Sequence, residues 1–566
     1  MKNIRYIISA FIAICFLNAC DDLLDREIVR DPTQDKSNTS FGNAQMRMNG
    51  FYTLLPNGFF YLDEMALMAS ASDEAEQTWE NSQIHKFNTG AWGPLDNPDG
   101  DAWSRNFTGI RGVSLFLTTL DKIDLDGIKY DLEKKDEYEK SMSDITRWEY
   151  EARFLRAFFY FELVKRYGGI PIIDEIYDLD TDFSLVPRRS IEDCVNYIVD
   201  ECDTVAKYLP TRYLDAGDLG RATSGAALSL KSRVLLYAAS DLFNDVSWAG
   251  DYSDKELIFM PAGNRDQRWK AAADAAKAVI DLVEARYQLS DSYVNLFKSY
   301  TDNEIIFALR YDSSNDFEKF NYPIGYDLGE SGTAPSQNLV DAYEMRNGDK
   351  FDWDNDEHRT NPFLNRDPRL ANTVLLNNTM FQGRHVEAYT GGRDGKGTPK
   401  ASRTGHYLFK YLDSELDLLQ DRKSIHSWIL FRLGEIYLNY AEALNEYEPG
   451  NPDIRSYLNE VRAREGVSMP GVPFGLSQDD MRDRIRHERR IELAFEDHRF
   501  WDVRRWMIAE TTLNVPLRGV EIEKQGDNFI YTPIIVENRR FEKKMYLYPI
   551  PQNEISVAKW SQNPLW

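Results

Sequence analysis

The sequence predicts a mainly α protein in which paired helices form a tetratricopeptide-like scaffold beneath a loop-rich α+β cap. Helical patterns fill most of 41–285 and 427–506, whereas 290–425 is rich in Tyr, Asn, Gly and Asp and has no clear hydrophobic period. We therefore expect the first two stretches to form the scaffold and the third to form the cap. A mixed segment of loops and short strands is expected over 507–566.

The scaffold is predicted to centre on one helix that begins at Ser141. Ser141 and Asp144 form an S-x-x-D start signal, and Gly168-Gly169 followed by Pro171 forms a stop signal. Its apolar residues occupy two faces, one with Trp148, Ala152, Leu155, Phe159 and Leu163 and another with Phe154, Phe158 and Phe161. A helix that is apolar on two faces packs between neighbours, so this helix should lie inside the scaffold.

The remaining scaffold helices follow from their periodicity and their end signals. They are expected at 40–55, 103–120, 190–209, 223–240, 267–283, 427–446, 453–464 and 477–506. Helix pairs of this length are typical of tetratricopeptide-like packing, although the consensus of that repeat and its clean period are absent.

The chain begins with a predicted lipoprotein leader. An apolar run over 7–17 follows two basic residues and is too short to span a bilayer. It ends in L-N-A-C, where Ala19 is the small residue that a signal peptidase requires and Cys20 is the acyl acceptor. An ordinary secretory signal cleaved nearby is the alternative.

The leader predicts how the chain is divided and where it is located. We expect a signal peptide over 1–19, a tether over 20–40 and a folded body over 41–566. Acyl chains on Cys20 would anchor the protein stably to a membrane, because each buried methylene contributes about 0.8 kcal/mol. The sequence alone leaves open whether the protein faces the outside or the periplasm.

Composition excludes several classes of function. The 566 residues carry a net charge of −25 without a basic run, which argues against binding nucleic acid. Cys194 and Cys202 lie eight residues apart in a predicted helix, or about 12 Å, which is too far for a disulfide. We expect both to be buried as small apolar residues.

No motif predicts catalysis, a metal or a cofactor. The seven histidines form no metal-binding pair, and neither a nucleophile elbow nor a phosphate-binding loop is present. Asp352, Asp354 and Asp356 imitate a calcium loop, but Glu357 stands where that loop needs glycine. Charged residues crowd 488–505 and could form a catalytic cluster, but helix-spaced ion pairs are the preferred interpretation.

Three stretches resemble the SusD/RagB family of outer-membrane nutrient-binding lipoproteins. E-A-R-F-L-R-A-F-F-Y-F-E-L-V-K-R-Y-G-G-I-P at 151–171 is similar to that family's signature helix. R-H-E-R-R-I-E-L-A-F-E-D-H-R-F-W-D-V-R-R-W at 486–506 is similar to its second motif, and 546–566 to its C-terminal end. The chain is therefore identified as a member of this family.

The resemblance implies a function and a partner. SusD-like proteins combine four helix pairs with a loop-rich subdomain, capture nutrients at the cell surface and work beside a SusC-like TonB-dependent transporter. They are not enzymes, and in this family the second motif is structural. The resemblance also implies that glycans bind at loops near 56–101 and 311–326.

Aromatic residues in these two loops are the candidate binding residues. Flat rings among amide and carboxylate groups suit a sugar, whose C–H faces stack on rings while its hydroxyls form hydrogen bonds. The predicted glycan-binding residues are Asp73, Trp79, Trp92, Tyr311, Asn315 and Tyr322. The alternative for each ring is packing beneath its own loop, and a fallback site is 351–358 around Trp353.

The sequence thus predicts a surface-anchored, non-enzymatic glycan-binding protein that delivers its ligand to a TonB-dependent transporter. Three alternatives stay open: a SusD-like carrier of peptides or another nutrient, a scaffold that binds only proteins, and a secreted glycoside hydrolase. A hydrolase would need two carboxyl groups about 5–10 Å apart in a cleft.

Overall fold

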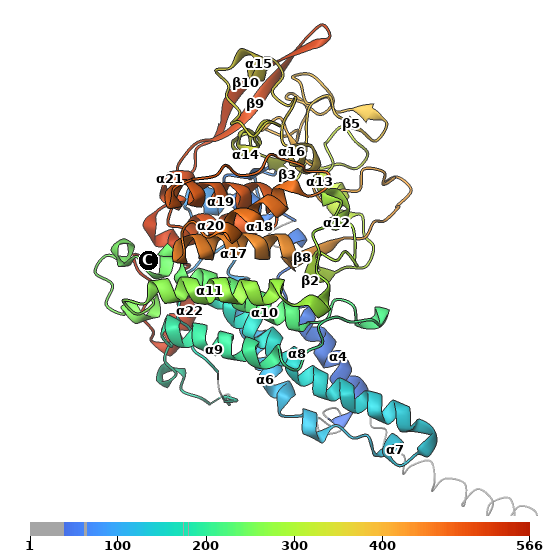
Figure 1. The fold of residues 1–566 in the computed structure, drawn as a ribbon, viewed down its shortest axis with the longest axis vertical. Helices are drawn as coiled ribbons and strands as arrows, with labels where there is room; N and C mark the ends of the chain where they lie inside the picture. Colours follow the sequence, from blue (N-terminus) through green and yellow to red (C-terminus); the bar gives the residue numbers. More distant parts are fainter. Residues whose placement is uncertain (1–38, 61–64, 174, 179) are drawn as a thin grey trace, which may run out of the picture.

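A stack of long helices forms the centre of the molecule in a computed structural model, which describes residues 39–60, 65–173, 175–178 and 180–566 (Figure 1). The helices of the stack are α4 (Phe41–Tyr52), α6 (Asp101–Leu117), α8 (Lys135–Tyr167), α9 (Ile191–Val205), α10 (Ser224–Ala239), α11 (Arg265–Ile280), α17 (Leu433–Tyr447), α18 (Pro452–Ala463), α19 (Gln478–Glu492) and α20 (His498–Arg505). Consecutive helices contact one another from α6 and α8, through α9, α10 and α11, to α17, α18 and α19. The structure is therefore mainly α and helix-paired, as predicted.

The longest helix, α8, has 33 residues and begins at Lys135 rather than at the predicted Ser141. Ser141 is buried inside it and caps nothing. The acids Asp136 and Glu137 lie in the first turn, where negative charge favours the helix dipole and extends the helix toward its N-terminus. The predicted end is confirmed, because Gly168 follows Tyr167 with a positive φ of 73°.

The cap is inserted between two neighbours in the stack. Helices α11 and α17 lie side by side although residues 281–432 separate them in the chain. Strand β2 (Ile305–Arg310) pairs with β8 (Ser427–Arg432) and joins the start of this insertion to its end. The other short elements are α12 (Tyr293–Leu296), α13 (Asp316–Asn321), β3 (Thr333–Pro335), α14 (Gln337–Ala342), α15 (Asp356–Thr360), α16 (Pro368–Thr373), β4 (Val374–Leu375), β5 (Met380–Phe381), β6 (Arg384–His385) and β7 (Tyr407–Leu408).

Two predicted helices are wrong in part. The predicted helix 427–446 begins as strand β8, whose six residues are all buried. A short, continuous apolar run does not distinguish a buried strand from a buried helix. The predicted helix 477–506 is interrupted between α19 and α20, where Phe495 and Asp497 adopt left-handed φ values of 63° and 62°.

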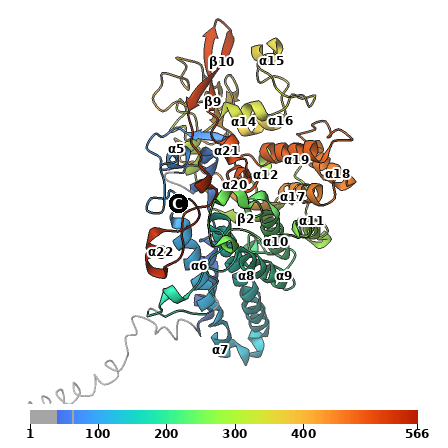
Figure 2. The same cartoon turned by 90° about the vertical axis from the view of Figure 1, so that its left-hand side faces the viewer.

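The remaining elements lie between α4 and α8 and after α20. Strand β1 (Ala75–Gln77) and α5 (His85–Thr89) lie in the N-terminal loop, whereas α7 (Asp126–Lys129) precedes α8. After α20 come α21 (Ala509–Thr512), the hairpin of β9 (Leu517–Gln525) and β10 (Asn528–Glu537), and α22 (Gln552–Ala558). Figures 1 and 2 show this hairpin projecting at the end of the molecule opposite α7.

Cys194 and Cys202 are buried and free, which confirms the predicted absence of a disulfide between them. The leader, Cys20 and most of the tether lie outside the described residues. None of the described helices is both long enough and apolar enough to cross a bilayer.

Candidate functional site

The two loops predicted to bind ligand meet at one place. Strand β1 of the first loop pairs antiparallel with β3, which directly follows the second loop, with Gln77 opposite Thr333. Beyond this pair the backbone N–H of Thr78 donates to the carbonyl oxygen of Gly332 at 2.9 Å. The ladder therefore holds residues 78–80 beside residues 320–332.

Two aromatic rings lie together where the loops meet. Trp79 and Phe320 are both half-buried, and their ring centroids are 5.2 Å apart in an edge-to-face arrangement with an interplanar angle of 61°. The indole N–H of Trp79 donates to the backbone carbonyl of Glu330 at 3.0 Å, which fixes the orientation of the ring. An edge-to-face pair whose rings keep exposed area offers stacking surface at a small entropic cost.

Gly332 allows this close approach. Its N–H donates to the carbonyl oxygen of Phe320 at 2.6 Å, and a Cβ at Gly332 would lie 2.5 Å from the same oxygen. Any other residue would therefore push Phe320 away.

Charged groups border the rings. The Lys400 ammonium lies 2.5 Å from the Glu330 carboxylate, and both side chains are exposed to solvent. His85 contacts the Trp79 carbonyl oxygen through Nε2 at 2.9 Å. We call the set of Trp79, Phe320, Glu330, Lys400 and His85 the Trp79–Phe320 surface.

An ion pair between Arg403 and Glu76 lies between this surface and the β9–β10 hairpin. Arg403 binds Glu76 through Nε at 2.6 Å, although burial raises the pKa of Glu76 to about 7. Arg403 also lines a cavity of about 350 Å³ between residues 388–405 and the β9–β10 hairpin. With Glu76 and Arg403, polar groups therefore extend from the two rings toward the β9–β10 hairpin.

Two of the predicted rings are packing residues. Trp92 is 6% exposed and packs against Phe87, Tyr548 and Trp566. Tyr322 is completely buried, and its hydroxyl donates to the carbonyl of Asp413. Neither ring has a free face for a sugar in this structure, which corrects the prediction for both.

The two predicted hydrogen-bonding residues are also buried. Asp73 accepts hydrogen bonds from Arg499 at 2.8 Å and from Arg490 at 2.7 Å. Burial disfavours its charge, but the two guanidinium groups hold the pKa of the Asp73 carboxyl well below its usual range. The Asn315 amide donates to Asp421 and to the Arg422 carbonyl and holds a loop together, so the prediction is corrected here as well.

Tyr311 lies at another surface. Its half-buried ring packs on Phe59 and lines a cavity of about 550 Å³ with Tyr52 and Arg221. Among the predicted residues, Trp79 is thus the one that occupies the junction of the loops. The fallback residue Trp353 is half-buried, and its indole N–H donates to Asp341 at 3.0 Å.

Sequence reasoning missed the partners of Trp79. Phe320 stood among the loop aromatics, but nothing in its spacing distinguished it from the buried Phe317 and Tyr322 beside it. Lys400 and Glu330 lie on different loops, so no local pattern pairs them.

The charged cluster at 488–505 is largely buried, and four of its acids each bind at least two cations: Glu488, Glu492, Glu496 and Asp502. Glu492 accepts hydrogen bonds from Arg369, Arg432 and Arg464 at 2.7–2.9 Å, and none of the four side chains is more than 1% exposed. These cations hold the pKa of Glu492 far below its usual range despite its burial. Acids that remain ionised, buried and paired hold the cap on the stack, which supports the structural interpretation.

Comparison with known proteins agrees with this architecture. Residues 303–566 match the model of the SusD family, and residues 32–236 match a second model described as starch-binding associating with outer membrane. The chain belongs to the SusD family. Helices α8, α19 and α20 carry the two signature motifs. Helix α8 packs against α6 and α9 inside the stack, and α19 contacts the cap where Glu488 and Glu492 bind Arg369 of α16.

Individual SusD-like relatives span most of the chain. A SusD-like protein of Formosa agariphila, P2, is 25% identical over 72% of this chain and 71% of its own length. The crystal structure of a SusD-like protein from Bacteroides fragilis superposes with a TM-score of 0.77 at 26% identity, covering 94% of this chain and 98% of the other. A second one, described as a SusD-like carbohydrate-binding protein, gives 0.74 at 25% identity and covers 92% and 99%. SusD-like proteins are typically binding proteins rather than enzymes, and their family is associated with the outer membrane.

Proposed function

We propose that this SusD-like protein binds a glycan on the Trp79–Phe320 surface. The observation that carries the proposal is that two separate loops converge on one pair of half-exposed rings with hydrogen-bonding groups at its edge. A pyranose can stack on the rings while its hydroxyls reach Glu330 and Lys400. Binding of this kind needs no covalent change and no cofactor.

A binding assay with a matched control tests the surface. Affinity gel electrophoresis against starch, laminarin and pectin should show retardation by at least one polysaccharide. Trp79→Ala and Phe320→Ala should each reduce that retardation. Phe474→Ala removes an 81% exposed ring beside Arg455 and should have no effect. Equal retardation of all variants would place the binding site elsewhere.

We further propose that the protein is anchored through Cys20 and delivers its ligand to a SusC-like TonB-dependent transporter. Family membership and the lipobox-like L-N-A-C at 17–20 support this step. Cys20→Ala should abolish labelling by a fatty-acid probe and release the protein from the outer membrane. Affinity purification from detergent extracts should recover a large β-barrel protein. Recovery of the protein alone under every detergent condition would contradict delivery.

The rival functions are outcomes of the same experiments. Release of reducing ends from the bound polysaccharide would indicate a hydrolase, whereas binding to a peptide library without binding to any glycan would indicate a peptide carrier. The proposal requires glycan binding without release of reducing ends.

A further inference from the structure

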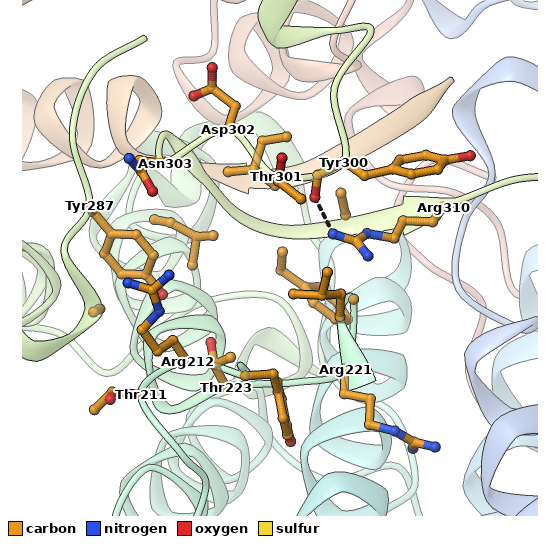
Figure 3. A pocket seen from close by; sticks show the side chains of 18 of the residues that line it. Thr211, Arg212, Arg221, Thr223, Tyr287, Tyr300, Thr301, Asp302, Asn303 and Arg310 are labelled. Atoms are coloured by element: carbon orange, nitrogen blue, oxygen red, sulfur yellow. Dashed lines mark hydrogen bonds between the residues drawn. The ribbon is translucent and has the colours of Figure 1, made fainter. Parts of the chain in front are cut away.

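A second cavity carries chemistry that the Trp79–Phe320 surface does not use. It has a volume of about 260 Å³ and lies between residues 211–223 and residues 300–310 (Figure 3). It shares no lining residue with the Trp79–Phe320 surface. Ligand pockets commonly measure about 300–1,000 Å³, so a space of this size suits a small group such as one sugar unit.

Two arginines on its wall have no acidic partner. Arg310 donates to the backbone carbonyl of Tyr300, and among the described residues no carboxylate forms an ion pair with it. Arg212 is exposed and likewise forms no ion pair within the described part of the chain. Figure 3 shows Arg212 beside Tyr287 on one side of the cavity and Arg310 below Tyr300 on the other.

The other charged residues of the wall, Arg221 and Asp302, already have partners. Arg221 points away from the cavity and binds Glu151 at 3.0 Å and Asp218 at 2.9 Å. The Asp302 carboxylate accepts from the Ser290 hydroxyl at 2.7 Å and from the Glu304 N–H at 2.8 Å. Asp302 keeps its negative charge, so the lining side chains without an ion pair among the described residues, Arg212, Arg310 and Asp302, together carry one net positive charge in a chain whose net charge is −25.

Arg310 packs against Gly220 and lies between two cavities. Its aliphatic Cδ would lie 3.1 Å from a Cβ at Gly220, whose φ of +95° also favours glycine. Arg310 lines both this cavity and the 550 Å³ cavity that contains Tyr52 and Tyr311. A guanidinium with hydroxyl groups on one side and tyrosine rings on the other fits a sugar that carries an oxyanion.

We propose that this cavity binds an acidic saccharide, whose carboxylate or sulfate group contacts Arg310 while Arg212 holds the same sugar unit from the opposite wall. The neighbouring sugar unit would extend past Arg310 onto the ring of Tyr311. Proteins bind both anions through the same charge-assisted hydrogen bonds, and arginine matches their planar or tripodal oxygens well. The negative net charge repels such a ligand at long range, but at physiological salt the repulsion is screened beyond roughly 8 Å.

Titration calorimetry on the full chain tests the proposal with matched ligands. Digalacturonic acid supplies the carboxylate, galactose 6-sulfate supplies the sulfate, and galactobiose is the neutral control. At least one acidic ligand should bind ten times more tightly than galactobiose, and the stronger of the two identifies the anion. Inorganic sulfate should bind at least ten times more weakly than that sugar.

Matched variants test the residues. Arg212→Gln and Arg310→Gln should each weaken binding of the acidic sugar about tenfold. Arg286→Gln removes the same charge from an exposed residue next to Tyr287 that does not line the cavity, and it should change nothing. Because Arg212 is exposed, its variant should fold even if the variant of Arg310 does not.

The proposal would be overturned if acidic and neutral sugars bound equally well, or if neither acidic sugar bound. It would also be overturned if Arg286→Gln weakened binding of the acidic sugar as much as Arg212→Gln and Arg310→Gln do. Inorganic sulfate that binds as tightly as the sugar would make the cavity a general anion site and would also overturn it. Trp79→Ala should leave the acidic sugar's affinity unchanged, so failure of the Trp79–Phe320 surface and failure of this cavity are distinguishable.

Discussion

The buried junction between stack and cap and the loop surfaces of the cap use similar residues differently. At the junction, arginines such as Arg432 and Arg464 are buried, and carboxylates surround them. In the cap, Arg310 lies beside a cavity without a carboxylate partner among the described residues, and Trp79 keeps part of its ring exposed. Buried charges that are paired hold the fold together, whereas a guanidinium without a carboxylate partner or a partly exposed ring at a surface is available to a ligand.

The largest effect should come from breaking the stack. Phe159 is completely buried on α8, and a Cβ at Gly109 of α6 would lie 2.5 Å from its ring. Phe159→Ala should lower the free energy of unfolding by about 3–5 kcal/mol through the cavity it creates. Leu132→Ala, at a 91% exposed residue, should change it by less than about 0.5 kcal/mol. Urea denaturation measures both, and a similar small loss in the two variants would mean that α8 is peripheral.

The next effect concerns a buried ion pair in the stack. Arg505 and Trp506 donate to Glu442, and Arg505 also binds Asp502 at 2.7 Å. Glu442→Gln should cost about 3 kcal/mol at pH 7, because Arg505 loses one of its two carboxylates.

The pH dependence of this effect has a defined sign. Although burial alone would raise it, the pKa of Glu442 is lowered to about 2 by Arg505 and Arg489. A lowered pKa in the folded state stabilises the fold above the unfolded value of about 4.5, and this stabilisation is lost as the pH falls toward 2. Denaturation at pH 7 and pH 3 should therefore show a smaller difference between wild type and variant at pH 3. A constant difference would contradict the ion pair.

The sequence could predict the central helix of the stack but not every element that packs against it. The central helix, its glycine stop and its burial follow from local periodicity, because α8 must bury two faces wherever its neighbours come from. Strand β8 was misassigned because its pairing partner β2 lies more than a hundred residues earlier in the chain. Local patterns carry no information on such a partner.

The binding residues were harder to predict for the same reason. Trp79 and Trp92 belong to the same aromatic loop, yet Trp92 packs on Trp566 at the end of the chain. Asp73 was expected to face a ligand, but its arginine partners lie more than four hundred residues later. Which face of a loop is buried depends on these long-range contacts.

A smaller effect should come from the backbone between the loops. Gly332→Ala would place a methyl group against the Phe320 carbonyl and should cost about 1–3 kcal/mol of stability by overpacking. It should also weaken polysaccharide binding, because Phe320 moves away from Trp79. Gly383→Ala has no atom within 4 Å of the new methyl and is a control for added bulk, although its φ of +78° adds some strain. If Gly332→Ala binds like the wild type, the edge-to-face pair is not needed.

The smallest expected effect comes from removing the Trp79 ring in Trp79→Ala. Stacking on a pyranose hides roughly 60 Å² of ring, worth about 1.5 kcal/mol at 25 cal/mol per Å². Loss of this ring therefore corresponds to about a tenfold weaker affinity.

One measurement tests the central claim most directly: calorimetric affinity and free energy of unfolding, determined together for Trp79→Ala and Trp92→Ala. The bound polysaccharide from the electrophoretic screen, cut to a short oligosaccharide, is the ligand. We predict that Trp79→Ala binds it about tenfold more weakly at nearly unchanged stability. Trp92→Ala should lose about 3–5 kcal/mol of stability and, while folded, keep its affinity. An unchanged affinity in Trp79→Ala, or weaker binding at unchanged stability in Trp92→Ala, would contradict the assignment of the Trp79–Phe320 surface.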